Sequence, residues 1–229
     1  MIAEESHPDN QIDDSGSWLS IGDLMSALLM IFALLLISAL VQIAEVSEKS
    51  KNNRVMIIKG LEDGFKAAGI DAAPNPETGD ISITNSVLFQ QDDYLLKDVG
   101  KSFLDKFIPI YSQVVFQNKA TADEVVRIVV EGHSSSEGNF EHNMRLSVLR
   151  ANSVFEYISL MDFPNKNAFF TKLLISGRGA IEADQSIANE EDRKVVFRFQ
   201  FKGQEFQKVV GQEGLKDVSE SAFFKVVVA

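Results

Sequence analysis

One uninterrupted apolar segment limits the folds open to this chain more than any other feature. Residues 24–44 read LMSALLMIFALLLISALVQIA, and these 21 residues include no Asp, Glu, Lys or Arg. At a helical rise of about 1.5 Å per residue they span roughly 30 Å, the thickness of the hydrocarbon core of a bilayer. We therefore predict a transmembrane helix over residues 18–44, with Trp18 at the water–lipid interface.

An acidic residue, Asp23, stands at the N-terminal end of this segment. A carboxylate costs about 2.5–3.5 kcal/mol at the centre of a bilayer, and somewhat less at this depth. Asp23 is therefore either the carrier of a translocated ion or an interfacial residue that caps the helix. On an ideal helix it shares a face with Ser26 and other small residues, which suits contact with further membrane helices. We expect Ser26 to line the ion path beside Asp23.

The flanks of the apolar segment bear on processing and topology. The segment is too long for the apolar region of a signal peptide and no cationic region precedes it, so we expect an uncleaved anchor. The tail at residues 1–17 is acidic and has no Lys or Arg, whereas Lys49, Lys51 and Arg54 follow the helix. Counted by the positive-inside rule, these charges would place the N-terminus outside the cytoplasm.

Composition excludes several classes of function. The formal net charge is −11 and no basic patch is visible, which argues against a nucleic-acid partner. The chain has no cysteine, so disulfides, iron–sulfur clusters and thiol catalysis are excluded. The spacing of His133, Glu137 and His142 fits no common zinc pattern, and no nucleophile–base pair or phosphate-binding glycine loop is visible. We expect no enzyme activity, no metal and no cofactor.

Residues 45–80 are predicted to hold a linker and an amphipathic helix. Residues 45–54 (EVSEKSKNNR) are polar and charged, whereas apolar residues recur at helical spacing from Val55 to Ala68. This helix either packs on the domain that follows or pairs with its copy in a dimer. The Pro- and Gly-containing stretch DAAPNPETGD ends it.

Residues 81–202 alternate between strand and helix patterns. The predicted elements are strands at 81–89, 124–131, 170–176 and 194–202, and helices at 96–115 and 143–160, the first of them kinked or ended at Pro109. The order β-α-β-α-β-β predicts an α/β (α+β sandwich) domain in which helices cover one side of a small sheet. Residues 203–229 are a C-terminal extension, which we interpret as an edge strand or a docking segment.

The loop and helix at residues 132–151, GHSSSEGNFEHNMRLSVLRA, combine groups that could bind a ligand. Asn143, Ser147 and Arg150 share a helix face, displaced from an apolar stripe at 144–158, and the polar loop precedes them. Such a pocket suits a planar carboxylate, which Arg binds through a bidentate fork. Arg150 could instead form a structural ion pair with a nearby Glu.

These residues resemble the peptidoglycan-binding domain of the OmpA/MotB family. That family has a G-[HY]-T-D loop, an aromatic–Asn pair and L-S-x-x-R-A; the segments here are GHSS (132–135), HN (142–143) and LSVLRA (146–151). Further blocks agree in order, namely VLF (87–89), ISGRG (175–179) and DRKVV (192–196). The resemblance covers residues 81–202 and implies an OmpA/MotB-like periplasmic domain that binds the cell wall.

The resemblance also implies roles for individual residues. Arg150 stands where the family's Arg holds the diaminopimelate carboxylate, and Ser135 stands where the family has the Asp that takes the ligand's ammonium group. The carboxylate half of recognition is thus retained and the ammonium half is weakened, unless Glu137 replaces the missing acid. The predicted peptidoglycan-binding residues are Ser135, Glu137, His142, Asn143, Leu146 and Arg150.

The membrane segment is similar to that of MotB-like stator B subunits. Trp18 and the run IGDLMS (21–26) match the family's W…[YS]-x-D-[FL]-M-[TS] segment. In that family the Asp takes and releases the translocated H⁺ or Na⁺, and two B subunits sit within a ring of five multi-helix A subunits. The resemblance therefore implies a homodimer with a MotA/ZorA-like partner and Asp23 as the ion carrier. It also implies a single-pass protein of the bacterial inner membrane with a cytoplasmic N-terminus, against the charge count.

The tail bears on the kind of stator. Flagellar MotB subunits have strongly basic N-terminal tails, whereas this tail is short and acidic. The segment GDLMS (22–26) looks closer to ZorB, the MotB-like subunit of the Zorya anti-phage defence system. We expect a proton-driven subunit of that kind. A flagellar or gliding-type stator subunit, and a passive peptidoglycan anchor that moves no ion, are the alternatives.

Overall fold

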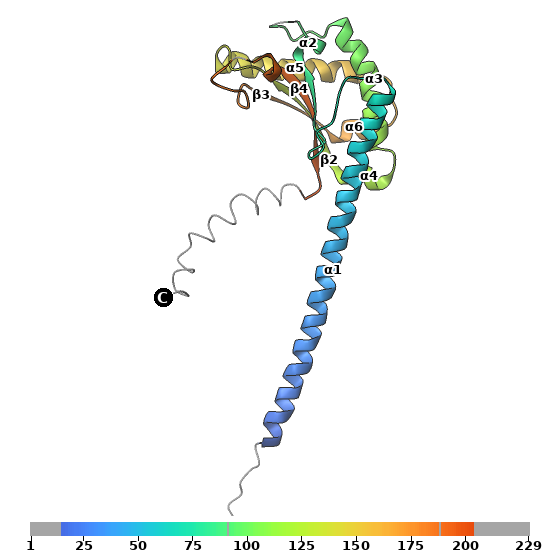
Figure 1. The fold of residues 1–229 in the computed structure, drawn as a ribbon, viewed down its shortest axis with the longest axis vertical. Coiled ribbons are helices and arrows are strands. Elements are labelled where there is room, and N and C mark those ends of the chain that lie inside the picture. Colours follow the sequence, from blue (N-terminus) through green and yellow to red (C-terminus); the bar gives the residue numbers. More distant parts are fainter. Residues whose placement is uncertain (1–14, 91, 188, 204–229) are drawn as a thin grey trace, which may run out of the picture. The chain divides into compact units, whose positions relative to one another are not determined.

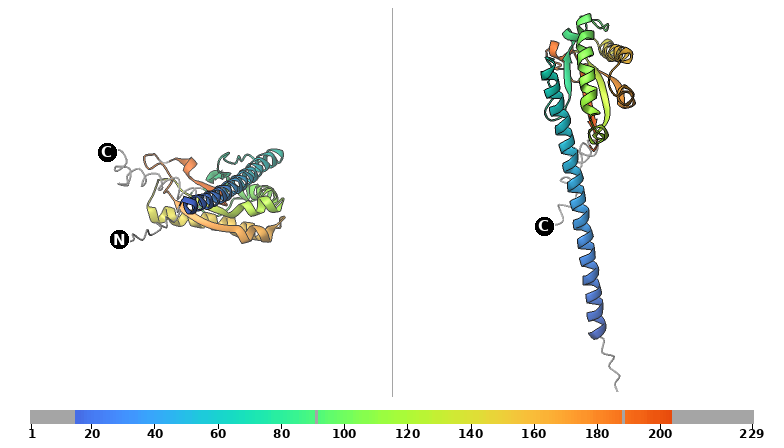
Figure 2. Two further views of the ribbon diagram at one scale, coloured as in Figure 1. Left: turned by 90° about the horizontal axis from the view of Figure 1, so that it is seen from below. Right: turned by 90° about the vertical axis from the view of Figure 1, so that its right-hand side faces the viewer.

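The computed structural model describes residues 15–90, 92–187 and 189–203 of the chain (Figures 1 and 2). The chain divides into two compact units, Met1–Lys49 and Ser50–Ala229. The tail before Ser15 and the predicted C-terminal extension after Gly203 lie outside the described residues.

The first unit is formed by the N-terminal part of the helix α1 (Ser15–Ala67). By length and composition, α1 is the one helix of the described ranges that is long and apolar enough to cross a membrane. Its large apolar side chains from Leu24 to Val46 are exposed, as a lipid-facing segment requires.

The helix continues through residues 45–54, which we predicted to be a linker between two elements. This stretch contains neither Gly nor Pro. Most of its residues are compatible with a helix, and an ion pair of 2.7 Å joins Glu45 to Lys49 one turn later. A polar composition was therefore insufficient evidence for a break in the helix.

The C-terminal part of α1 belongs to the second unit and enters its core. Ile57, Leu61 and Phe65 are fully buried, and the Phe65 ring stacks on the Phe107 ring with centroids 5.0 Å apart. The predicted amphipathic helix is confirmed, and it packs on the domain that follows. Its buried face differs from the predicted one at the start, since Val55 is exposed.

The second unit is an α/β domain with a mixed four-stranded sheet of order β1-β4-β2-β3. Strands β2 and β3 are parallel, and β4 pairs antiparallel with both β1 and β2. The strands are β1 (Ile81–Thr84), β2 (Val125–His133), β3 (Leu173–Gly179) and β4 (Lys194–Phe201). The helical elements after α1 are α2 (Asn85–Leu88), α3 (Asp98–Val115), α4 (Lys119–Glu124), α5 (Phe140–Leu160), α6 (Lys166–Lys172) and η1 (Glu190–Asp192).

The core lies between one face of this sheet and the helices α1, α3 and α5. Alternate residues of β4 point into it, and the Phe197 ring lies 4.9 Å from the Phe107 ring of α3. The Tyr111 ring of α3 stacks on the Phe199 ring at 5.0 Å. The residues between them, such as Arg198, therefore belong to the opposite face of the sheet.

Two predicted strand boundaries are wrong, and one of the two alternatives for Pro109, an end of the helix, is excluded. The first predicted strand ends at Thr84, and the helical turn α2 follows it. Helix α3 continues through Pro109, which does not end it. The third predicted strand begins only at Leu173, because α6 takes up its first residues. Phe and Thr favour strands, so a short helix rich in them resembles a strand by composition.

Candidate functional site

The loop after β2 and the first turns of α5 form a pocket of about 190 Å³ at one end of the sheet. All six residues predicted to bind a ligand line it: Ser135, Glu137, His142, Asn143, Leu146 and Arg150. The pocket also contains residues that we did not predict, namely Asp92, Ser134, Gly138 and Arg193. The structure thus brings the predicted set together, and the binding role of its members stays a prediction.

Two glycines allow α5 to lie directly against the sheet beside the pocket. A Cβ on Gly132 would lie 2.0 Å from the backbone oxygen of Ser147, and one on Gly177 would lie 2.7 Å from the Ser147 hydroxyl. The same hydroxyl accepts a hydrogen bond of 2.9 Å from the backbone N–H of Gly179. Bare backbone on β2 and β3 is therefore required for this part of α5 to reach the pocket.

The α5 face that carries Asn143, Ser147 and Arg150 is buried. Of the apolar stripe beside it, Ala151 and Ile158 are buried as well, whereas Val148 is 45% exposed. Polar side chains can occupy the buried face because they find partners at the end of the sheet. The Asn143 amide donates to the backbone oxygens of Ser135 and Glu137, at 3.2 and 2.9 Å, and so fixes the pocket loop.

Arg150 is the most deeply buried charge of the pocket, with only 2% of its surface exposed. Its Nε donates to the backbone oxygen of Asp93 at 3.0 Å, and its guanidinium carbon lies 5.7 Å from the centroid of the Phe89 ring. Within the described ranges its two terminal nitrogens have no hydrogen-bond partner and no carboxylate lies within ion-pair distance, although the charges of Asp92 and Asp93 act on it from nearby. Among the described residues, the structural ion pair with a Glu that we considered as the alternative is therefore not formed.

The charge of Arg150 is retained despite its burial. Burial, followed by the neighbouring charge of Arg193, lowers the pKa of the Arg150 guanidinium to about 10. The group is thus cationic at neutral pH. The nearby charges of Asp92 and Asp93 raise this pKa, but by less than burial and Arg193 lower it. A buried cation without a directly bonded counterion is expensive, and a planar guanidinium fork pairs best with a carboxylate or phosphate. The pocket is therefore suited to an anionic group.

Arg193, the second arginine of the pocket, is fully paired. Its Nε donates to the Ser135 hydroxyl at 3.0 Å, and its terminal nitrogens contact Glu137 at 2.7 Å and Glu190 at 2.8 Å. It therefore ties the loop after β2 to η1. Arg193 is 58 residues from Ser135 in the sequence, and only its place in the DRKVV block could have indicated it.

Asp92 lines the pocket from the loop that precedes α3. Its backbone has a positive φ of 57°, and its Oδ1 lies 3.7 Å from Nε2 of His142. No motif marked this residue, because the contact joins segments about 50 residues apart that meet only in the fold.

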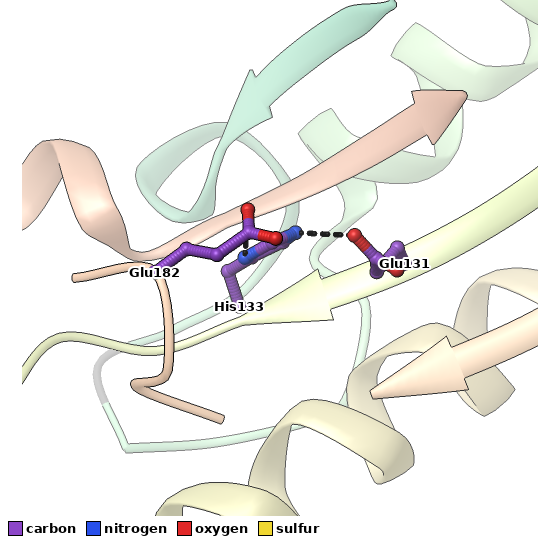
Figure 3. Close-up of side chains that lie close together, drawn as sticks. All are labelled: Glu131, His133 and Glu182. Carbon is purple, nitrogen blue, oxygen red and sulfur yellow. Dashed lines mark hydrogen bonds and ion pairs between the residues drawn. The ribbon is translucent and has the colours of Figure 1, made fainter. Parts of the chain in front are cut away.

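A second group of charged residues, the sheet-face network, lies on β2, β3, β4 and nearby loops: Asp80, Glu131, His133, Arg178, Glu182 and Arg198. Figure 3 shows the imidazole of His133 between Glu131 and Glu182. Its Nε2 lies 3.1 Å from Glu131 Oε1, and its Nδ1 lies 3.9 Å from Glu182 Oε2. His133 therefore does not line the pocket and is not brought together with Glu137 and His142 in the described structure.

Arginines neutralise the carboxylates of this network. Arg178 contacts Glu182 at 2.8 Å, and Arg198 contacts Glu131 at 3.3 Å. Although atoms of Glu131, His133 and Glu182 are close enough to ligate one ion, two guanidinium groups already pair with those oxygens. Burial raises the pKa of the Glu131 carboxyl, but the hydrogen bond with His133 and the charge of Arg198 outweigh it and hold the pKa below its usual value.

The predicted ion-path residues lie on α1 in the first unit. Asp23 and Ser26 are exposed, three residues apart on the helix. The Ser26 hydroxyl donates to the backbone oxygen of Gly22 at 2.8 Å, so it is bonded to its own helix. The roles of both residues stay predictions.

The sequence of this domain matches a known protein family, and the chain is similar to the proteins described below. Residues 88–196 match the model of the OmpA family, and this range contains every residue that lines the pocket. The Zorya protein ZorB of Escherichia coli strain Crooks is 27% identical over 163 residues, which cover 63% of this chain and 68% of that protein. The Zorya protein ZorB of Escherichia coli O139:H28 is 24% identical over 202 residues, covering 81% and 80%. The crystal structure of a MotB-like protein from Desulfovibrio vulgaris covers 69% of this chain and 96% of its own at 16% identity, with a TM-score of 0.48.

Proposed function

We propose that this chain, a MotB-like OmpA-domain protein that resembles ZorB, is the B subunit of an ion-driven stator anchored to peptidoglycan, acting in Zorya-type anti-phage defence. In this proposal α1 crosses the bacterial inner membrane once, with the N-terminus in the cytoplasm and the domain in the periplasm. Two copies form a dimer, around which five copies of a MotA/ZorA-like multi-helix subunit assemble.

The observation that carries the wall-binding part is the guanidinium of the buried Arg150, whose terminal nitrogens have no hydrogen-bond partner among the described residues. Peptidoglycan stem peptides present carboxylates, and two parallel N–H···O bonds from Arg150 would satisfy its terminal nitrogens. Hydrogen bonds to charged groups contribute about 1.5–3 kcal/mol each. In this proposal, the two hydrogen bonds between Arg150 and one ligand carboxylate supply most of the binding free energy.

The ion-driven part depends on Asp23 at the head of the apolar segment. An ionised Asp23 attracts a proton, and its neutralisation removes the cost of a charge near lipid. The A ring can then turn against the B dimer, which the domain holds still at the wall. Moving one charge through 100 mV releases about 2.3 kcal/mol, enough to bias each step.

Co-sedimentation with purified sacculi tests wall binding. The full chain in detergent should pellet with sacculi, and Arg150→Ala should lower its affinity by about 100-fold, the equivalent of two weak charge-assisted hydrogen bonds. Arg178→Ala is the matched control, because it removes an arginine of the sheet-face network. Equal pelleting of Arg150→Ala and the wild type would contradict the proposal.

The variant Asp23→Asn tests whether the protein translocates ions through Asp23. It should abolish protection against phage and ion flux in cells, while the A–B complex still co-purifies. Full protection by this variant would leave the passive anchor as the better account.

A further inference from the structure

The two residues expected from the sequence to accept a ligand ammonium group are already engaged. Ser135 carries no charge, and its hydroxyl accepts from Arg193 Nε at 3.0 Å. Glu137, the predicted substitute, is held by Arg193 at 2.7 Å. A ligand ammonium group at Glu137 would have to compete with a guanidinium for the same carboxylate.

Asp92 is the remaining carboxylate that lines the pocket, and no arginine holds it. Its side chain is 80% exposed, and the nearest basic group is the His142 imidazole at 3.7 Å, beyond hydrogen-bond distance. The left-handed backbone at residue 92, with φ 57°, fixes the direction in which this side chain leaves the loop.

Asp92 and Arg150 belong to the same site, and the charge of Asp92 raises the pKa of the Arg150 guanidinium without direct contact between the two groups. The backbone oxygen of Asp93 accepts from Arg150 Nε at 3.0 Å, which ties the loop of Asp92 to the guanidinium. Both side chains line the pocket, yet they do not form an ion pair. The described site thus offers a buried cation and a carboxylate that attract each other without an ion-pair contact, so that a ligand group can bind to each of them.

We infer that Asp92 takes over the ammonium half of recognition, so that the pocket binds a zwitterionic group, the carboxylate on Arg150 and the ammonium on Asp92. The ligand class is an α-amino acid end, as on a diamino-acid side chain of a wall peptide or on a free amino acid. This inference deepens the proposed wall binding and rests on it for the source of the ligand. Asp92 also disfavours a carboxylate that lacks an ammonium group, because two negative charges would then face each other.

Binding of two small probes to the full chain in detergent tests the inference. Free diaminopimelate should bind at least about 10-fold more tightly than its di-N-acetyl derivative, which keeps the carboxylates and lacks the charge on nitrogen. In Asp92→Asn the two affinities should agree within about 3-fold. Glu137→Gln tests the competing assignment and should keep the preference. A preference that survives Asp92→Asn, or that disappears in Glu137→Gln, overturns the inference.

Sacculi separate this inference from the proposed function. Acetylation of the free amines of sacculi should release the wild type and leave the weaker binding of Asp92→Asn unchanged. If the wild type binds sacculi through Arg150 and acetylation has no effect, the inference fails and wall binding stands. If the wild type binds free diaminopimelate in an Asp92-dependent way but not sacculi, the inference stands and wall binding fails.

Discussion

The domain contains two groups of charged side chains that differ in whether their charges are satisfied within the chain. In the sheet-face network each described charge has an opposite charge close by, as Arg198 has in both Glu131 and Asp80. In the pocket, Arg193 is fully paired, whereas the more deeply buried Arg150 has no carboxylate in ion-pair contact in the described chain.

Residue type alone would not separate these two groups, since both combine Arg, Asp or Glu, and His. They differ in whether each charge has an oppositely charged contact within the chain. A buried charge without a partner costs several kcal/mol, whereas a buried pair that is complete can be close to neutral for stability. An unpaired charge is retained when something outside the chain completes it, and this trade of stability for function is common at binding sites.

The largest effect on stability is expected in the network, from Glu131→Ala. This change leaves Arg198 and His133 without one of their partners, and breaking a buried pair costs about 3–5 kcal/mol. Chemical denaturation should show that loss, while binding to sacculi at a temperature where the domain is folded should be unchanged. A loss of binding at unchanged stability would show that the network belongs to the ligand site.

Arg193→Gln is expected to have a smaller effect on stability, together with a loss of ligand binding. The variant removes the contacts that join Ser135 and Glu137 to Arg193. Because these contacts are partly exposed, their loss should lower the free energy of unfolding by about 1 kcal/mol. Sacculus binding should weaken by about 5- to 10-fold because the loop is less well ordered. Glu190→Gln, which removes only the outermost partner of Arg193, is the control and should change binding by less than about 2-fold.

The smallest effect concerns pH and two carboxyls that share Arg198. The pKa of Glu131 is lowered in the fold, so its contribution to stability is present above the pKa of the unfolded chain and is lost as pH falls through the folded value. Burial raises the pKa of Asp80, more than Arg198 lowers it, so protonation of Asp80 stabilises the fold as pH falls. Between pH 6 and pH 3, the free energy of unfolding should therefore fall less steeply with decreasing pH in Glu131→Gln than in the wild type, and more steeply in Asp80→Asn. The same change of slope in both variants would contradict this assignment.

The sequence was sufficient for what depends on local pattern. The apolar segment, β2, α5 and β4 follow from periodicity and composition, and the pocket set around Asn143 and Arg150 follows from a motif confined to residues 132–151. The motif places Arg150 on a helix, but it does not say whether a Glu from elsewhere pairs with it. That question was decided by the fold.

The features that sequence reasoning missed depend on contacts between distant segments. Asp92 reaches the pocket only because its loop packs beside Arg150, and Arg193 because β4 lies next to β2. The burial of the polar residues of α5 was not predicted, for a related reason. Its polar residues are buried because glycines on β2 and β3 let the helix approach, and helical periodicity contains no information about that approach.

Thermal unfolding of Arg150→Met, with and without diaminopimelate, tests most directly whether Arg150 is held for a ligand. Met keeps much of the buried volume and removes the unpaired charge. We predict that Arg150→Met has a Tm equal to or above that of the wild type without ligand, and that diaminopimelate raises the Tm of the wild type alone. A fall in Tm comparable to that of Glu131→Ala would contradict the account, because Arg150 would then be a structural residue like those of the sheet-face network.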